Sequence, residues 1–201
     1  NVLAQGIGAE QQTQFISALN DAITRRVLQL NLEKHNFDGI EWAWLAFGSE
    51  GRDEQTFSTD QDNGIVFVCE DAATLDNLRQ RFLSFALDVN KDLDRCGFPL
   101  CKGNIMASNP QWCLSLDEWK DQFSQWIRQP HPDALLNATI FFDFRPLFGK
   151  ADLAEAMRRH LLQQTASSPM FLRAMAKNAL DVEPPLGKIR DFLTDLEPGQ
   201  P

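Results

Sequence analysis

Apolar residues recur along the chain at spacings that predict helices and strands. Residues 10–34 carry an apolar residue at every third or fourth position, which predicts one long amphipathic helix. The stripe consists of Phe15, Leu19, Ile23, Val27 and Leu30. Two short apolar runs follow, "IEWAWLAF" at 40–47 and "GIVFVC" at 64–69, and both predict strands. Residues 71–97 begin with acidic and small residues and then become amphipathic, so we expect a second helix there.

The second half of the chain alternates between broken and periodic segments. Residues 98–112 are interrupted by proline and glycine and predict a loop around one short strand. Ser115 is followed three residues later by Glu118, a capping box that predicts a helix over 115–129. The remaining expected elements are a strand over 135–149, helices over 151–166 and 169–180, and a further element that begins at 182–193.

The order of these elements predicts an α+β fold with a mixed β-sheet flanked by helices. Strands cluster in the middle of the chain, and helices alone occupy its end. We expect a long N-terminal helix at 1–36 that packs on a sheet domain at 37–150. The beginning of a C-terminal helical domain is expected at 151–201. Because this last part stops soon after an element begins, we expect it to be truncated and the chain to be part of a longer protein.

Composition narrows the classes of partner. The formal net charge is -9, whereas proteins that bind duplex nucleic acid are normally basic, so we expect no nucleic-acid partner. The longest apolar runs, such as "ATIFF" and "WAWLAF", are much shorter than the roughly 20 residues that cross a bilayer, so no membrane span is expected. The four cysteines lack the C-x-x-C spacing of a zinc site, which favours a reduced, cytoplasmic setting.

The stretch "FGSEGRDEQTFSTDQDNGIVF" at 47–67 has the residues of a phosphate site. Gly48 and Gly51 allow the backbone to approach a phosphate closely, and Ser49 adds a small hydroxyl. If "EGRDEQ" opens a short helix, its first amide groups add further donors. The sequence therefore predicts a phosphate-binding turn directly after the first strand.

Carboxylates near this turn predict a metal site. Asp60 and Asp62 point to one side, because side chains alternate along extended backbone, and two such carboxylates repel each other unless a cation lies between them. Asp143, in "IFFDFRP", is the best third carboxylate, since a charge among phenylalanines needs a reason. If its strand lies beside that of Asp62, the three converge on two metal ions. Alternatively, Asp60 and Asp62 are turn residues, and Asp143 forms a structural ion pair with Arg145.

The motif from Gly48 to Asn63 resembles the Gly-Ser…Asp-x-Asp signature of the nucleotidyltransferase superfamily that includes DNA polymerase beta. It is most similar to a bacterial nucleotidyltransferase family related to the N-terminal domain of PII uridylyltransferase. Members of that family are often linked to CBS and cyclic-nucleotide-binding domains. The similarity extends from about Phe15 to Phe192, through "CKGNIMASNPQW", "SLDEWKDQFSQWI", "IFFDFRPLFGKADL" and "PPLGKIRDF".

This resemblance implies a nucleotidyltransferase-type fold and a role for each motif residue. Asp60, Asp62 and Asp143 would be the catalytic residues and the ligands of two Mg²⁺ or Mn²⁺ ions. The implied nucleotide- and phosphate-binding residues are Gly48, Ser49, Gly51, Arg52, Glu54, Gln55 and Asn63. Arg52 would neutralise phosphate charge, or it is an ordinary surface charge.

The resemblance also implies an activity. A nucleoside monophosphate would be transferred from ATP or UTP to a hydroxyl of a PII-like signalling protein or of a small molecule, and regulatory domains would accompany this one in the full-length protein. The alternative is a catalytically silent nucleotide-binding module in a signal-transduction protein. Other residues are expected to be structural: Cys101 packs, and the tryptophans at 112, 119 and 126 share one core face because their spacing is two helical turns.

Overall fold

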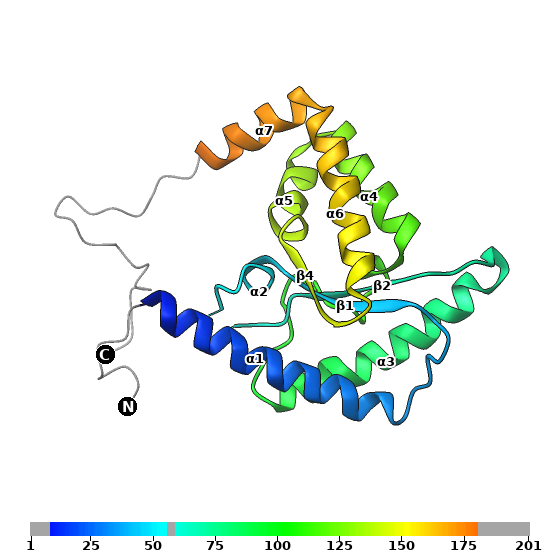
Figure 1. Cartoon of the computed structure of the whole chain (residues 1–201). Helices are drawn as coiled ribbons and strands as arrows, with labels where there is room; N and C mark the ends of the chain where they lie inside the picture. Colours follow the sequence, from blue (N-terminus) through cyan, green and yellow to red (C-terminus); the bar gives the residue numbers. More distant parts are fainter. Residues whose placement is uncertain (1–8, 56–58, 181–201) are drawn as a thin grey trace.

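The computed structural model describes residues 9–55 and 59–180, which form a four-stranded β-sheet covered by helices (Figure 1). The strand order is β3-β2-β1-β4. The strands are β1 (Trp42–Phe47), β2 (Asn63–Phe67), β3 (Cys113–Ser115) and β4 (Phe144–Gly149). Strand β1 pairs antiparallel with both β2 and β4, whereas β2 and β3 are parallel. The predicted α+β class with a mixed, helix-flanked sheet is confirmed.

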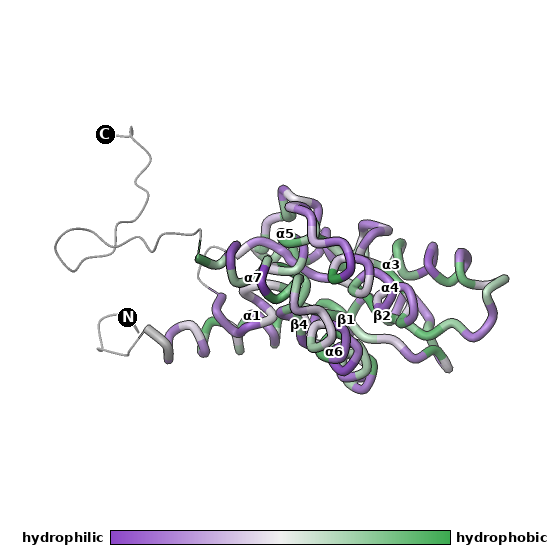
Figure 2. The backbone as a smooth tube through the Cα atoms, turned by 90° about the horizontal axis from the view of Figure 1, so that it is seen from above, coloured by the Kyte–Doolittle hydropathy of each residue, from purple (hydrophilic) through white to green (hydrophobic). Residues whose placement is uncertain are grey.

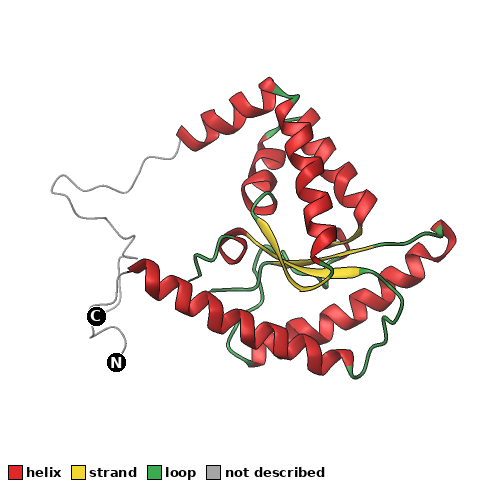
Figure 3. Ribbon diagram, in the orientation of Figure 1, coloured by secondary structure: helices red, strands yellow, loops and turns green. Residues whose placement is uncertain are grey.

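Helices lie on both faces of the sheet, so the fold has three layers (Figure 3). One face is covered by α1 (Ala9–Leu32) and α3 (Leu75–Arg95). The other face is covered by α4 (Leu116–Arg128), α5 (Pro132–Phe141) and α6 (Ala151–Ala166), and α7 (Pro169–Leu180) follows α6. Figure 2 shows hydrophobic and hydrophilic segments alternating along α1 and α3, as expected for helices with one face on the sheet.

Strand β1 lies between two hydrophobic cores and is buried along its whole length. Trp42, Trp44 and Ala46 contribute to the core beneath α1 and α3, while Ala43, Leu45 and Phe47 contribute to the core beneath α4, α5 and α6. A strand covered on both faces needs a continuous apolar run, which is what "WAWLAF" provides. The predicted first strand is therefore confirmed, and β1 is the fixed centre of the sheet.

The expected strand over 135–149 is wrong in its first half. Residues Pro132–Phe141 form α5, and only Phe144–Gly149 form β4. The ring Nδ1 of His131 accepts the Ala134 N–H at 3.3 Å and caps this helix. Within α5 the buried residues recur at helical steps, namely Ala134, Ala138 and Phe141, a period that the strand interpretation overlooked. Asp143 consequently lies at the junction of α5 and β4 and not inside a strand.

Two further expectations need correction. The short strand lies at Cys113–Ser115, directly after the expected loop over 98–112 and not within it. The predicted apolar stripe of α1 is only partly its buried face: Val27 is buried and Ile23 packs on the core, whereas Phe15 and Leu19 are 62% and 52% exposed. The buried positions of this helix include several polar ones, namely Ser17, Asp21, Thr24 and Asn31. Polar contacts therefore help to hold α1 on the sheet.

The expectations for the helices after β3 are mostly confirmed. Ser115 Oγ accepts the Glu118 N–H at 3.3 Å, and Glu118 Oε2 accepts the Ser115 N–H at 2.8 Å, which is the predicted capping box. The three tryptophans share one core, since Trp119 and Trp126 are buried and the Trp112 ring stacks on Trp119. None of the described helices is long and apolar enough to cross a membrane.

Helix α6 packs on the same core as the sheet. Leu153, Ala154 and Met157 are buried there together with the inner side chains of β1. The expected domain boundary at residue 150 stays a prediction. The element expected at 182–193 lies outside the described residues.

A network of ion pairs fixes α1 to the edge strand β4. The Arg145 guanidinium binds both carboxylate oxygens of Asp21, at 2.7 and 2.8 Å. Its Nη2 also lies 2.9 Å from Asp53 Oδ1, and its Nε donates to the Glu50 carbonyl at 2.9 Å. Arg25 contacts Asp21 and donates to the Leu147 carbonyl at 3.0 Å. Because the Asp21 carboxylate is buried, Arg145 is the main compensation for its charge.

We predict that Asp21→Leu or Arg145→Met lowers the free energy of unfolding by roughly 2–4 kcal/mol, because each leaves a buried partner uncompensated. The double variant Asp21→Leu/Arg145→Met should recover at least half of that loss, since an apolar pair replaces the ion pair. Urea denaturation of the four proteins measures both effects. Additive losses in the double variant would show that the ion pair does not hold α1 to β4.

Candidate active site

The candidate site is built around the C-terminal end of β1. After Phe47 the chain turns directly into the short helix α2 (Gly48–Gly51). The Phe47 N–H donates to the Asp62 carbonyl, and the Gly48 N–H donates to the Asp143 carbonyl, both at 3.0 Å. Because β1 lies between β2 and β4, Asp62 and Asp143 flank this turn from opposite sides.

The backbone conformation at Gly48 and the close packing at Gly51 both disfavour any residue other than glycine. Gly48 has a φ of +54°, a left-handed conformation that would cost a residue with a side chain about 1–2 kcal/mol. A Cβ on Gly51 would lie 2.3 Å from the Asp143 carbonyl oxygen, so only glycine allows α2 to lie this close to the junction of α5 and β4. The expected helix at "EGRDEQ" is wrong in position, because the helical turn comes earlier, at Gly48–Gly51.

Residues 60–63 alternate between two surroundings, as the sequence predicted. Asp60 is exposed and Asp62 is half-buried, whereas Gln61 and Asn63 are buried. The Asn90 amide on α3 donates to Gln61 Oε1 at 2.8 Å and to Asn63 Oδ1 at 3.1 Å. The Gln61 amide donates to the Asn90 carbonyl at 3.0 Å. This amide network fixes the backbone of residues 60–63, so that the two aspartates share one side.

Asp60, Asp62 and Cys101 form one group of metal-ligating side chains. One ligand atom from each, a carboxylate oxygen or the sulfur, lies within 4.8 Å of the other two. Burial raises the pKa of Asp62, a hydrogen bond from the Cys101 thiol opposes that rise, and the Asp60 charge adds to it. Cys101, which we expected to pack, is partly buried and lies beside the two aspartates. Sequence reasoning missed it because 39 residues separate Cys101 from Asp62, and no spacing rule joins them.

Asp143 lies on the other side of the turn and has a different partner. Its Oδ2 accepts a hydrogen bond from Arg52 Nη1 at 2.8 Å, and Arg52 Nε binds Glu54 Oε2 at 2.7 Å. The Asp143 side chain is 47% exposed, so it is not the buried charge that its phenylalanine neighbours indicated. Nor does it pair with Arg145, whose partners are Asp21 and Asp53. Among the described residues, Asp143 does not join the group of Asp60, Asp62 and Cys101.

Two of the residues predicted to bind the nucleotide, Gln55 and Asn63, are hydrogen-bonded to the scaffold. Gln55 is buried against α1, where its side chain accepts a hydrogen bond from Asn20 and its N–H donates to Ser17. The Asn63 side chain accepts hydrogen bonds from Asn90 and from the Ala107 N–H at 2.8 Å. Both side chains have scaffold partners, and their role in nucleotide binding stays a prediction.

Glu50 is an additional titratable group that sequence reasoning did not single out. Its side chain is buried under α2, with Arg145, Asp21 and Asp62 as the nearest charges. Burial raises the pKa of Glu50 to about 8; the Arg145 charge opposes this rise, and the charges of Asp21 and Asp62 add to it. A Ser-Glu-Gly turn gives no sign in the sequence that its glutamate points inward. The carboxyl is therefore largely protonated near neutral pH.

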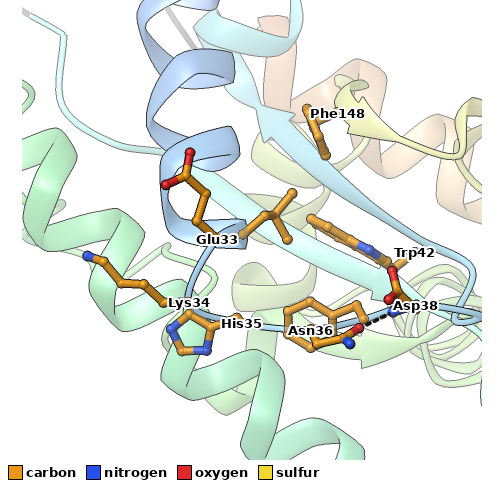
Figure 4. A pocket seen from close by; sticks show the side chains of 9 residues that line it. Glu33, Lys34, His35, Asn36, Asp38, Trp42 and Phe148 are labelled. Atoms are coloured by element: carbon orange, nitrogen blue, oxygen red, sulfur yellow. Dashed lines mark hydrogen bonds between the residues drawn. The ribbon is translucent and has the colours of Figure 1, made fainter.

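Hollows in the surface lie at both ends of β1. One hollow of about 570 Å³ lies beside the motif, between α1 and residues 52–54, and Asp21 and Arg52 are among its lining residues. Another, of about 450 Å³, lies at the opposite end, beside Trp42 and Phe148 (Figure 4). Residues 32–38 form the rest of its wall, and no residue of the 47–67 motif lines it. The hollow beside Arg52 therefore adjoins the motif, while Asp60, Asp62 and Cys101 are not among the residues that line it.

The donor set of this site fits a divalent cation. Carboxylate oxygens are the ligands that Mg²⁺ and Mn²⁺ prefer, and Asp60 and Asp62 present them together next to a glycine-rich turn. Arg52 is a cation close to the same turn. This combination suits a phosphate ester bound together with metal ions.

Comparison with known proteins gives one match. A family model described as "Putative nucleotidyltransferase DUF294" matches residues 1–133, which is 133 of the 201 residues. The matched region includes the turn at Gly48, the aspartates at 60 and 62, and Cys101, and it ends before Asp143. Searches of the curated proteins and of the solved structures found no match.

We predict that Glu50→Gln stabilises the protein increasingly as the pH rises. The folded-state pKa of Glu50, about 8, lies above the usual value of 4.5, so the folded protein binds more protons between these values. The free energy of unfolding of the parent protein therefore falls as the pH rises from about 4.5 to about 8, and the glutamine variant lacks this fall. Urea denaturation at pH 5, 6, 7 and 8 measures the difference between the two proteins.

Glu155→Gln, at an exposed position of α6, is the matched control and should show no such trend. If Glu50→Gln were less stable than the parent protein by the same amount at every pH, Glu50 would instead be a charged partner of Arg145.

Proposed function

We propose that this chain, which belongs to the nucleotidyltransferase family that its sequence matches, transfers a nucleoside monophosphate from a nucleoside triphosphate to a hydroxyl in a metal-dependent reaction. One observation carries the proposal. The turn at Gly48 is flanked by Asp62 and Asp143, through backbone hydrogen bonds of 3.0 Å on each side. This arrangement supports a phosphate site and carboxylate metal ligands at one strand end.

The residues divide into two functions. Asp60 and Asp62 hold Mg²⁺ or Mn²⁺ ions, which when bound lower the pKa of the acceptor hydroxyl and stabilise the leaving pyrophosphate. The Ser49 hydroxyl and the backbone of the turn that follows Gly48 bind the triphosphate, since the Gly48 N–H is already donated to the Asp143 carbonyl. Arg52, which is 40% exposed, moves from Asp143 to a phosphate oxygen when the nucleotide binds.

The reaction needs a base for the acceptor hydroxyl, and we assign this role to Asp143. Its carboxylate becomes available once Arg52 turns to the phosphates. The acceptor oxygen then forms a bond to the α-phosphorus, the bond from that phosphorus to the bridging oxygen breaks, and pyrophosphate leaves. Asp143 takes the proton of the hydroxyl. Positioning and charge neutralisation supply most of the rate enhancement in reactions of this kind.

The resemblance of the motif to the family related to PII uridylyltransferase suggests which nucleotide is the donor and which molecule is the acceptor. It suggests ATP or UTP as donor and a PII-like signalling protein as acceptor, with regulatory domains of the CBS type in a longer protein. The hollow between α1 and residues 52–54 adjoins Arg52 and is where the acceptor segment would lie. Glu54 contributes to the wall of this hollow.

One observation favours the second candidate function, a silent nucleotide-binding module. Asp143 is bound by Arg52 and stands apart from the Asp60–Asp62 pair. If this ion pair persists when the nucleotide binds, the acceptor hydroxyl has no base. The protein would then bind a nucleoside triphosphate without transferring it.

We predict that Asp60→Asn/Asp62→Asn abolishes the Mg²⁺-dependent binding of nucleoside triphosphates. Calorimetric titration of ATP, UTP, GTP and CTP into the parent protein should identify one preferred nucleotide, with an affinity at least tenfold higher than in the variant. Asp76→Asn/Asp121→Asn removes the same charge from exposed positions of α3 and α4 and is the matched control. Equal affinities in all three proteins would overturn the proposed site.

We predict that Asp143→Asn separates binding from transfer. The variant should retain the affinity for the nucleotide within about threefold and lose at least about 100-fold in turnover, since a general base typically contributes 10²–10⁴. Release of pyrophosphate in the presence of an acceptor measures turnover. Unchanged turnover would exclude Asp143 as the base, and the absence of turnover in the parent protein with every acceptor tested would support the silent module.

A further inference from the structure

Two segments of backbone bring Cys101 to the aspartate pair. The Gln61 N–H donates to the Pro99 carbonyl, and the Asn63 N–H donates to the Ile105 carbonyl, both at 3.1 Å. Residues 61–63 are therefore anchored to both ends of the segment that contains Cys101. The thiol is hydrogen-bonded to Asp62, and its sulfur lies within 4.8 Å of one carboxylate oxygen of each aspartate.

These separations are close to those of ligands on one ion. A Zn²⁺–sulfur bond is about 2.3 Å and a Zn²⁺–oxygen bond about 2.0–2.2 Å, so two ligands of one tetrahedral ion lie about 3.5 Å apart, against at most 4.8 Å between these atoms. The three side chains thus need only small movements to hold a cation in common. Mg²⁺ accepts oxygen ligands and disfavours sulfur, whereas Co²⁺ and Zn²⁺ accept both.

The surroundings of the sulfur act on the thiol in opposite directions: burial and the neighbouring Asp62 raise the pKa of Cys101, and two backbone hydrogen bonds oppose this rise. The backbone N–H groups of Gly103 and Ile105 are hydrogen-bonded to Cys101 Sγ. The turn that directs them is closed by the Asn104 N–H, which donates to the Cys101 carbonyl at 3.0 Å, with Asn104 in the left-handed conformation. Hydrogen bonds of this kind stabilise the charged form of a thiol and tune metal sites. They are independent of the two carboxylates.

We propose that Cys101 is a third ligand beside Asp60 and Asp62, and that the site binds borderline divalent cations such as Co²⁺ and Zn²⁺ more tightly than Mg²⁺. The role that we give to this metal site rests on the proposed function. The presence of three ligands at the site does not. On binding, the thiol releases its proton to solvent, and the sulfur forms a bond to the cation. The thiol thereby sets which metal the enzyme takes up.

The other cysteines of the described chain allow the assignment to be tested. Cys113 is buried, and burial raises its pKa to about 12, so it is inert as a ligand near neutral pH. Cys96 is exposed and is the suitable control position. Cys69 lies beyond the far end of β2, where its sulfur contacts Asp71 and Thr74.

The experiment is a Co²⁺ titration of the whole chain, followed by the sulfur-to-cobalt charge-transfer band in the near ultraviolet. The parent protein and Cys96→Ser should develop the band, while Cys101→Ser should lack it. Cys101→Ser should also bind Co²⁺ and Zn²⁺ at least about tenfold more weakly, with its Mg²⁺ affinity changed less than threefold. A band that persists in Cys101→Ser, or none in the parent protein, would overturn the proposal.

A second measurement needs no variant and therefore does not depend on whether Cys101→Ser folds. Alkylation of the parent protein with iodoacetamide, followed by mass spectrometry, should show that Zn²⁺ protects Cys101 at least tenfold and leaves Cys96 unprotected. Equal alkylation of Cys101 with and without Zn²⁺ would contradict the ligand role.

The two proposals can fail separately. A cobalt–thiolate band in a protein that binds no nucleoside triphosphate would retain the metal ligand and reject the nucleotidyltransferase site. Nucleotide binding that needs Asp60 and Asp62, without any band, would do the reverse.

Discussion

The burial of β1 on both faces is the constraint on which the candidate site depends. Its alternate side chains belong to two separate cores, so the strand cannot shift by one residue without exchanging its tryptophans with its smaller side chains. The backbone at its end is consequently fixed, and Phe47 and Gly48 present their N–H groups to Asp62 and Asp143. A rigid strand end of this kind is where chemistry can be placed with the accuracy that phosphoryl transfer requires.

The acidic groups around this strand end differ in whether an arginine compensates their charge. This difference distinguishes the groups that stabilise the fold from those of the candidate site. Arg145 compensates the buried Asp21 and also contacts Asp53, and Arg52 compensates Asp143. Glu50 avoids its charge by protonation, because burial raises its pKa. In the described part of the chain, the group of Asp60 and Asp62 has a thiol as its third member. A cation bound there would be stabilised by both carboxylates and would remove the repulsion between them.

The sequence predicted those parts of the fold that depend on local periodicity. Strand β1, α1, α6, α7 and the capping box of α4 were recognisable from apolar spacing and cap residues alone. The segment over 132–149 was not, because an apolar run of "LLNATIFF" is compatible with a helix or a strand until its neighbours are known. Part of the buried face of α1 was also hidden, since Asp21 is buried only because Arg145, 124 residues later, reaches it. Long-range compensation of this kind leaves no periodic signal.

The candidate site shows the same division between local and long-range information. The alternation of Asp60, Gln61, Asp62 and Asn63 is local, and it correctly placed both carboxylates on one side. That Gln61 and Asn63 are structural depends on Asn90 of α3, and that Cys101 belongs with the aspartates depends on backbone contacts at Pro99 and Ile105. The motif of sixteen residues therefore contains both side chains that can contact a ligand and side chains that stabilise the backbone. Only the partners of each, read from the fold, separate the two kinds, and they leave the ion pair between Arg52 and Asp143 as the contact whose opening, under the proposed mechanism, would decide between transfer and binding alone.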